Sequence, residues 1–366
     1  MCSSDLLKMH FFKFPTEWDS GTIDARWGWL KTQSTENPTP MSATDFEQLR
    51  AHITALAFWP GGTLLDSNHW HFEPRQFIKQ FKKCGWLKRD EMKQMVPSYA
   101  IRNAGSKGIL WEQIPLVLAA TGAFARQQVP LNKMLRKYGI RGEQRLSSFF
   151  GNAIQETAWF VAAPRYRNQI HENNTAERYF PWDGRGFLQL TWSDNYINYW
   201  DYLGRSNQIS AAVRTALHNA QVKVNTKPRS SAAYATADTV IPQVLKDWRN
   251  DVADPDGTDA AGSAGYYWAK LNMASYADAP HQLERVSVNT NAGNHTYYRS
   301  PSFWRASAAV NLPAAINTLY SHSLNGFEQR CSVYSVVLAI AGDDVRLFAS
   351  ANGTQLDFPE GMQPRR

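Results

Sequence analysis

Apolar residues recur at helical spacing over several stretches of the chain. In the segment 145–159, six apolar or small positions follow the three-and-four spacing of an amphipathic helix: Leu146, Phe149, Phe150, Ala153, Ile154 and Thr157. Similar patterns predict helices over 43–56 and 77–95. Two later apolar segments, 332–342 and 345–353, are separated by Gly342-Asp343-Asp344, which predicts a small β-hairpin. The polar run 225–239 is typical of a surface loop or linker.

These patterns divide the chain into three stretches and predict a mainly α fold. Residues 1–105 are rich in aromatic residues and interrupted by prolines, with a turn expected at Pro60-Gly61-Gly62, and we expect an accessory helical region there. Residues 106–325 are expected to form a helical domain with loops around a cleft. Residues 326–366 are expected to form a short β-rich extension.

The composition is that of a folded globular protein with a basic surface. The 366 residues are 43% hydrophobic and 19% charged, which is ordinary for globular domains. A formal charge of +7 favours an anionic partner, which could be nucleic acid, a membrane surface or the acidic stem peptides of a cell wall. The one dense basic run, 79–93, alternates with apolar residues as on the solvated face of a helix. Since no nucleic-acid-binding motif accompanies it, we expect no nucleic-acid partner.

The cysteines and the first residues bear on where the protein acts. Cys2, Cys84 and Cys331 are too few for a disulfide framework, and Cys84 is expected to be a small buried residue. The first residues lack the pattern of a signal peptide, and no apolar segment is long enough for a membrane helix. These features predict a protein that is made in the cytoplasm, does not insert into a membrane and leaves the cell without a signal peptide. Alternatively, the first residues are the cut end of a larger polypeptide.

Carboxylates, amides and aromatic residues are concentrated between residues 156 and 196. Cleavage of a glycosidic bond uses one carboxylic acid to protonate the leaving oxygen and usually a second carboxylate to activate water. Glu156 ends the helix predicted above, at the margin of its apolar stripe, where partial burial favours the protonated form. We therefore predict that Glu156 is the general acid; the alternative is an ordinary solvated helix residue.

The second carboxylate is expected in the polar segment that follows the helix. Glu172 and Glu177 both lie there, in a segment typical of a loop that lines a cleft. Glu172 has polar neighbours that keep a carboxylate ionised, whereas Glu177 precedes Arg178 and can pair with it. Glu172 is the preferred base, and Glu177 stays open as the alternative. Asp183 precedes a glycine and is more typical of a turn.

The motif GRGFLQLTWSDNY, residues 184–196, combines a tight turn with groups that bind sugars. Gly184 and Gly186 allow the backbone to turn sharply, and Arg185 can bind a carboxylate or a carbonyl. Amide, hydroxyl and aromatic groups suited to a sugar or to water are supplied by Gln189, Thr191, Trp192, Asn195 and Tyr196. Core packing is the alternative for the aromatic side chains.

Two further clusters suggest metal ligands only weakly. The segment 69–73 contains His69, His71 and Glu73, but no further metal ligand can be identified elsewhere in the sequence. Structural packing is therefore the preferred interpretation. The acidic run 251–259 lacks the ordered ligand positions of a calcium loop, and a capped loop before a helix is preferred. Its members are Asp251, Asp254, Asp256 and Asp259. No metal or cofactor is expected.

These motifs resemble glycoside hydrolase family 19, a group of the lysozyme-like superfamily that includes plant-type chitinases and phage endolysins. The shared features are a helix ending in Glu156-Thr157, a loop bearing Glu172, and the GRGxxQLTxxxNY pattern of 184–196. The segments SAGYYW (263–268) and VSVNTNAGNHTYYR (286–299) are similar to later parts of the family. With HWHFEPRQFIKQFKKCGWL (69–87) upstream, the chain is most similar to peptidoglycan-hydrolase modules of bacterial type VI secretion effectors.

The resemblance implies a lysozyme-like helical fold and a role for individual residues. It implies that Glu156 is the acid, Glu172 the base and Thr191 the residue that positions water. Substrate-binding amides are implied at Gln189, Asn195 and Asn291, although Asn291-Ala292-Gly293 replaces the Asn-Gly-Gly of the family. The loop between the carboxylates is shorter than in plant chitinases.

The implied activity is hydrolysis of β-1,4 bonds in the glycan strands of peptidoglycan. The family inverts the anomeric carbon by direct attack of water, which predicts carboxyl groups about 6.5 to 9.5 Å apart. The resemblance also implies action in the periplasm of a target bacterium, a secretion-apparatus carrier, and an immunity protein that inhibits the enzyme. A chitinase and a non-catalytic module that binds the cell wall are the alternatives.

Overall fold

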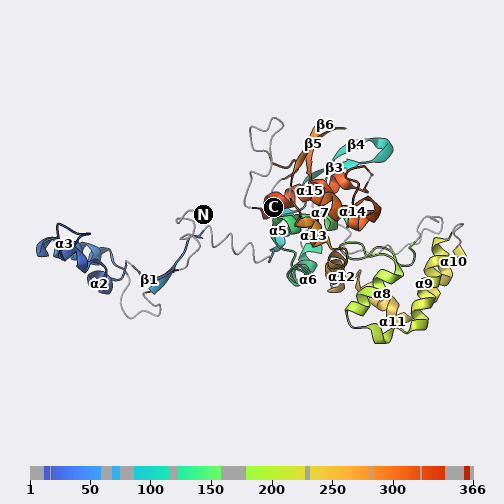
Figure 1. Cartoon of the computed structure of the whole chain (residues 1–366), viewed down its shortest axis with the longest axis horizontal. Coiled ribbons are helices and arrows are strands. Elements are labelled where there is room, and N and C mark those ends of the chain that lie inside the picture. The colour runs from blue at the N-terminus through green and yellow to red at the C-terminus, as the bar shows by residue number, and fades with distance from the viewer. Residues whose placement is uncertain are drawn as a thin grey trace. The chain divides into compact units, whose positions relative to one another are not determined.

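The computed structural model describes residues 12–16, 18–58, 68–74, 86–114, 123–157, 179–226, 231–280, 282–321, 324–342 and 358–362 (Figure 1). The chain divides into two compact units, residues 1–81 and 82–366. Helices dominate the described residues, and the strands among them form three two-stranded antiparallel sheets. The prediction of a mainly α fold is therefore confirmed. No helix in the described ranges is long and apolar enough to cross a membrane.

Among its described residues, the first unit contains two α-helices and one two-stranded antiparallel sheet. Helix α2 covers Ile23–Trp27, helix α3 covers Ala43–Leu56, and strand β1 (Phe12–Pro15) pairs with β2 (Asn68–His71). The bounds predicted for α3 are confirmed. The helix begins there because the Ser42 side chain accepts a hydrogen bond from the backbone N–H of Asp45 at 3.1 Å. The turn predicted at residues 60–62 and Cys2 lie outside the described residues.

The boundary predicted at residue 105 is wrong. Helix α5 (Arg89–Gln94) and strand β3 (Tyr99–Asn103) precede that point, yet both belong to the second unit. Met92 and Ala100 are fully buried in the same apolar cluster as helix α7. The helix predicted over 77–95 is also wrong as a continuous element, because residues 86–88 are not helical. Residues 75–85, which include Cys84, lie outside the described residues.

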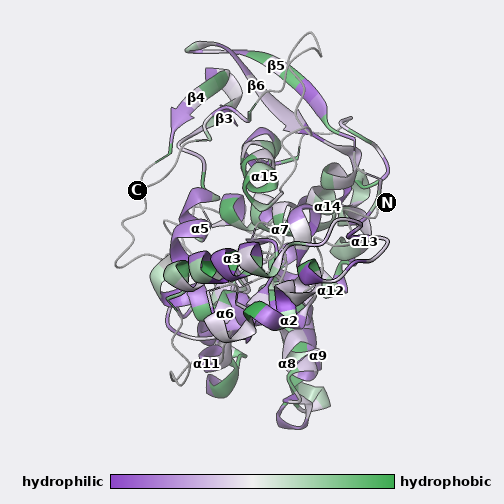
Figure 2. Cartoon of the chain, turned by 90° about the vertical axis from the view of Figure 1, so that its left-hand side faces the viewer, coloured by the Kyte–Doolittle hydropathy of each residue, from purple (hydrophilic) through white to green (hydrophobic). Residues whose placement is uncertain are grey.

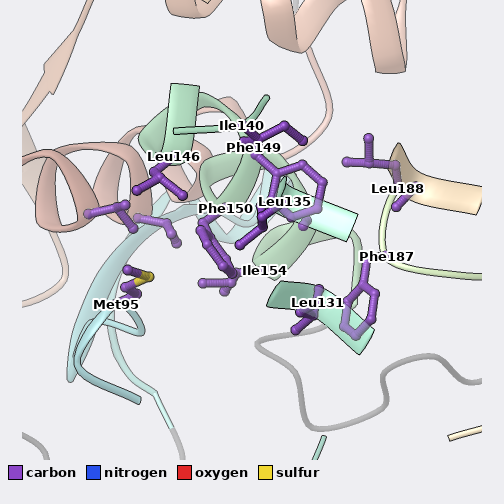
Figure 3. Packing of buried hydrophobic residues seen from close by; sticks show 14 of the residues in the cluster. Met95, Leu131, Leu135, Ile140, Leu146, Phe149, Phe150, Ile154, Phe187 and Leu188 are labelled. Atoms are coloured by element: carbon purple, nitrogen blue, oxygen red, sulfur yellow. The ribbon is translucent and has the colours of Figure 1, made fainter. Parts of the chain in front are cut away.

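The core of the second unit surrounds helix α7 (Gly142–Glu156). Its predicted apolar stripe is confirmed, since Leu146, Phe149, Phe150, Ala153 and Ile154 are all buried (Figure 3). The other helices of this core are α6 (Ala123–Lys137), α12 (Asp259–Lys270), α13 (Met273–Ala277), α14 (Pro301–Asn311) and α15 (Phe327–Ala341).

Helix α15 replaces the β-hairpin predicted at the carboxyl end. All residues from 327 to 338 except Glu328 are buried in this helix, which packs against α7, β3 and β6. A helix that is apolar all round belongs in the interior of a protein. The predicted separate stretch 326–366 is therefore wrong, because α15 is part of the core of the second unit. The second predicted strand, 345–353, lies outside the described residues.

Four more helices follow the glycine-rich turn of residues 183–192. They are α8 (Ser193–Tyr202), α9 (Ala211–Asn225), α10 (Ser231–Thr239) and α11 (Gln243–Asp251). The loop predicted over 225–239 is wrong for residues 231–239, which form α10. Tyr234 and Ala237 of this helix are buried against Phe180 and Val224, and this burial stabilises a helix in a polar sequence.

Two hairpins that the sequence patterns did not predict complete the second unit. Strand β3 pairs with β4 (Ile109–Gln113), and β5 (Glu284–Thr290) pairs with β6 (Gly293–Arg299). Both hairpins lie beside α15 (Figures 1 and 2). Residues 358–362 return to this region, where the N–H of Ser98 donates to the carbonyl of Gly361 at 2.8 Å.

Candidate active site

Glu156 is the last residue of α7, as predicted, and its carboxylate is bound to a buried arginine. Nη2 of Arg330 donates to Oε1 of Glu156 at 2.6 Å. The Glu156 side chain is 18% exposed and that of Arg330 is 1% exposed. The alternative of an ordinary solvated glutamate is therefore wrong. Within the described part of the chain, Oε2 of Glu156 accepts no hydrogen bond and so remains available to a ligand.

Arg330 fixes the end of α7 through all three of its nitrogen groups. Besides Glu156, it donates to Oδ1 of Asn152 at 2.8 Å and to the carbonyl of Asn325 at 3.0 Å. A buried guanidinium requires such partners, because burying an uncompensated charge is very unfavourable. Arg330 was not among the predicted site residues, since it lies just before the segment 332–342 that was predicted as a strand. The available signal was an arginine directly before a long apolar run, because arginine is rarely buried without a partner.

The turn over residues 183–192 is tight, as its glycines predicted. The backbones of Arg185 and Leu190 form two hydrogen bonds with each other, at 3.2 and 2.8 Å. Gly186 has a φ of +71°, and a Cβ at this position would lie 2.6 Å from Oγ of Ser263 and 2.9 Å from the carbonyl of Ala260. The turn therefore rests directly on helix α12, and only glycine fits at this contact.

Gly186→Ala is expected to lower the free energy of unfolding by about 2 to 4 kcal/mol, because it combines backbone strain with overpacking. Gly204 is the matched control, since its φ is +78° but nothing lies within 4 Å of an added Cβ. Gly204→Ala should cost only the backbone term, about 1 to 2 kcal/mol. Urea denaturation of the three proteins measures the difference. Equal losses would show that the contact with α12 contributes nothing.

Arg185 and Tyr196 are buried, which corrects their predicted role in substrate binding. Both side chains have 0% exposure. Nη1 of Arg185 donates to the carbonyl of Asp183 at 2.9 Å, and the Tyr196 hydroxyl donates to the same carbonyl at 2.8 Å. Burial raises the pKa of Tyr196, so the phenol stays neutral. These side chains hold the turn in place, and they cannot touch a substrate at the surface.

Two residues of the turn have left-handed backbone conformations that are unusual for side-chain-bearing residues. The φ angles are +51° at Gln189 and +70° at Trp192. Such strained positions are concentrated at binding and catalytic sites, where the surrounding structure maintains them. Trp192 is half-buried and meets the ring of Tyr179 edge to face, with centroids 5.9 Å apart.

The amides predicted to bind substrate are already used within the fold. Nε2 of Gln189 donates to the carbonyl of Gly186 at 3.0 Å. Nδ2 of Asn195 donates to the carbonyl of Thr191 at 2.8 Å, and its Oδ1 accepts from Nζ of Lys270 at 2.7 Å. The Thr191 hydroxyl is different: it makes no hydrogen bond with any described residue and is half-exposed. It remains able to bind water or a substrate.

Helix α12 lies against the turn, through Gly186. Phe187 of the turn belongs to the same core cluster as Ile154, two residues before Glu156 (Figure 3). Burial raises the pKa of Tyr267 on α12, and the charge of Glu156 raises it further. One turn further on, Lys270 binds Asn195. The turn and the end of α7 therefore belong to one apolar core, and α12 contacts the turn directly.

Asn291 lies elsewhere and has a structural role, which corrects its predicted contact with substrate. Its Oδ1 accepts from the N–H of Trp111 at 2.7 Å, and its own N–H donates to the carbonyl of Ile109 at 3.2 Å. These bonds attach the tip of the β5–β6 hairpin to β4. The hairpin and α8 lie at opposite ends of the second unit (Figure 1).

The remaining predicted site residues are the second carboxylate and the possible metal ligands. Glu172 and Glu177 lie outside the described residues. In the described ranges, no group of three or more His, Cys, Asp or Glu side chains is placed to hold a metal ion. In the acidic run, Oδ1 of Asp254 accepts from the N–H of Asp256, and Asp259 lies 3.7 Å from Arg205. The first contact lies in the turn before α12 and the second in the first turn of the helix, whose N-cap residue Thr258 makes no capping hydrogen bond with its side chain.

A scan with protein-family models, a search of curated proteins and a search of solved structures each found no match to this chain. The family resemblance therefore rests on the quoted motif residues alone. The geometry defines an acidic side chain held by a buried arginine, and a strained turn that carries a half-buried threonine and a half-buried aromatic ring.

Proposed function

We propose that this protein is a lysozyme-like glycoside hydrolase that cleaves the glycan strands of peptidoglycan. The observation that carries the proposal is the placement of Glu156. Its carboxyl group is held at one oxygen by the buried Arg330, while the other oxygen has no partner among the described residues. A fixed, partly buried carboxyl group is what protonation of a glycosidic oxygen requires.

The proposed roles follow from the contacts. As a proton donor, Glu156 carries its proton on Oε2, while Oε1 keeps the hydrogen bond from Arg330. Thr191 offers its hydroxyl to the attacking water, and Trp192 offers a half-exposed ring to a sugar. The motif resemblance assigns the base to Glu172, with Glu177 as the alternative.

The charge of the chain favours murein over chitin as the substrate. Stem peptides give peptidoglycan carboxylates that chitin lacks, and a protein of charge +7 is attracted to them. By the type VI resemblance, we further propose that the enzyme reaches the periplasm of a target cell, and that an immunity protein inhibits it by covering Glu156 and Trp192.

Product analysis tests the proposed activity. Purified peptidoglycan is incubated with the protein, and the soluble products are identified by mass spectrometry. Muropeptides with a newly formed reducing sugar end are expected, and this release should be lost in Glu156→Gln. Products cut only within the peptide, or an unchanged release by the variant, would refute the proposal.

Salt should weaken the action on peptidoglycan. Attraction between a basic protein and an anionic polymer is screened over about 10 Å at 0.1 M salt and about 3 Å at 1 M. We therefore expect binding and digestion of peptidoglycan to fall several-fold between these concentrations, with little action on chitin oligomers at either. Faster turnover of chitin oligomers than of murein would make the protein a chitinase.

The Arg330 contact also favours a second candidate, a module that binds the cell wall without cutting it. The hydrogen bond of 2.6 Å from Arg330 to Oε1 gives Glu156 a structural role at the end of α7 that requires no catalysis. Sedimentation of the protein with murein, with no soluble product across a range of pH and salt, would support this candidate. Release of muropeptides would exclude it.

A further inference from the structure

A pocket lies between helices α8 and α9. Its volume is about 470 Å³, and it opens widely to solvent. The lining residues come from one stripe on each helix: Asp194, Ile197, Asn198, Arg214, Thr215 and His218. Helix α8 begins directly after Trp192, so this pocket follows the 183–192 turn on the chain and in space. None of these residues has a role in the chemistry proposed above.

The pocket presents both hydrogen-bond acceptors and donors: Asn198, Arg214 and His218 carry N–H groups, and the acceptors are the following. The Thr215 hydroxyl donates its hydrogen to the carbonyl of Ala211 at 3.0 Å, so that only its lone pairs face outward. Asp194 can only accept when it is ionised, and a neutral His218 offers one acceptor nitrogen. The amide of Asn198 makes no hydrogen bond with any described residue and can supply a further acceptor oxygen.

The charges in the pocket leave one carboxylate accessible. Arg214 is neutralised by Asp201, to which it donates two hydrogen bonds at 2.8 and 2.6 Å, and its Nε donates to the carbonyl of Ile209. Asp194 is 62% exposed, and His218 lies 3.5 Å away as a partner that is charged only when protonated. Lys270 is bound to Asn195, and the Asp194 carboxylate raises the pKa of Lys270 against the lowering by burial, so Lys270 is a second cation near this carboxylate.

We propose that this pocket binds a primary ammonium group of the substrate, with Asp194 as its main contact. An ammonium group has three donors and no acceptor, so the exposed carboxylate of Asp194 and the acceptor oxygens of Asn198 and Thr215 can receive it. This inference rests on the proposed function and names a feature of the same substrate. Two parts of a cell wall carry such a group, namely the amino group of a stem peptide and an amino sugar that lacks its acetyl group.

The test compares murein with free amines and murein whose amines have been acetylated. Binding is measured by sedimentation in Glu156→Gln, which prevents digestion, with and without Asp194→Asn. Acetylation should weaken binding about threefold to fivefold when Asp194 is present, as expected for one exposed charge pair at low salt. In the Asp194→Asn protein, acetylation should have no effect. Asp90→Asn removes an exposed carboxylate from the first turn of α5 and should behave like the parent.

Small probes separate the two sources of the ammonium group. Saturation-transfer NMR with Nα-acetyl-lysine and with glucosamine reports which amine binds, and their N-acetylated forms are the controls. A signal from the lysine probe that Asp194→Asn removes indicates a stem peptide, and one from glucosamine indicates a deacetylated sugar. The proposal is overturned if neither probe binds, or if acetylation of murein has the same effect with and without Asp194. Because neither measurement needs catalysis, both decide the matter even if the protein cleaves nothing.

Discussion

Glu156→Gln is expected to lower the rate of muropeptide release by at least about a hundredfold, while the fold remains intact. Glutamine has the shape of glutamate, and its carbonyl oxygen can still accept the hydrogen bond from Arg330 that Oε1 now accepts at 2.6 Å. It cannot donate a proton to a leaving oxygen. Release of soluble muropeptides from purified peptidoglycan measures the rate, and circular dichroism reports the fold.

Glu143 provides the matched control for this substitution. It lies in the first turn of the same helix, α7, thirteen residues before Glu156, which is about 20 Å along a helix axis. Glu143→Gln should leave the rate unchanged. A rate that is equally low in both variants, or unchanged in Glu156→Gln, would contradict the assignment. Glu172→Gln should be severe and Glu177→Gln mild; the reverse order would assign the base to Glu177.

Arg330→Met is expected to lower the free energy of unfolding by about 3 to 5 kcal/mol. The substitution preserves much of the apolar volume but removes the partner of the Glu156 carboxylate, which is 18% exposed. It also leaves the carbonyl oxygen of the Asn152 side chain without its donor. Leaving such groups unpaired in the interior accounts for most of the loss. Urea denaturation measures it.

A surface ion pair and a double substitution serve as controls for this effect. Arg102 pairs with Glu112 across the β3–β4 hairpin, with both side chains about 40% exposed, so Arg102→Met should cost only about 1 kcal/mol or less. Combining Arg330→Met with Glu156→Gln should recover part of the lost stability, because it removes the unpaired charge. If Arg330→Met were no worse than Arg102→Met, the buried pair would not hold α7 and α15 together.

The elements that the sequence predicted well are those whose signals are local. Helix α3 has a serine cap and helix α7 has a strong amphipathic period, so both can be recognised from neighbouring residues. The tight turn could be predicted because Gly184 and Gly186 stand two residues apart, next to polar groups. Each of these features depends on contacts within one element or with its immediate surroundings.

The elements that were missed depend on distant partners. Helix α15 is apolar on all sides, so it has no amphipathic period to distinguish it from a strand, and only its length of 15 residues favours a helix. Helix α10 is stabilised by the burial of Tyr234 and Ala237 against other segments. The β5–β6 hairpin alternates apolar and polar residues over 284–290, which is a signal that could have been used.

For the candidate site, the motif identified the right segment but not the role of each side chain. Arg185 and Tyr196 have the chemistry of binding residues, yet they are buried and bind the carbonyl of Asp183. Sequence cannot separate these roles, because a hydrogen bond to a backbone carbonyl and one to a sugar require the same donor. Arg330 could not be matched to Glu156, because the pairing depends on how α15 packs against α7.

The pairing of Glu156 with Arg330 joins positions 174 residues apart, and this separation sets when the site can form during synthesis. A ribosome adds about 5 to 20 residues per second, so Glu156 waits roughly ten to thirty seconds for its partner. Throughout that time the apolar face of α7 that later packs against α15 is exposed on the nascent chain. The candidate acid is therefore held in position only after α15 has left the ribosome, and a chain that stops before Arg330 has no assembled site.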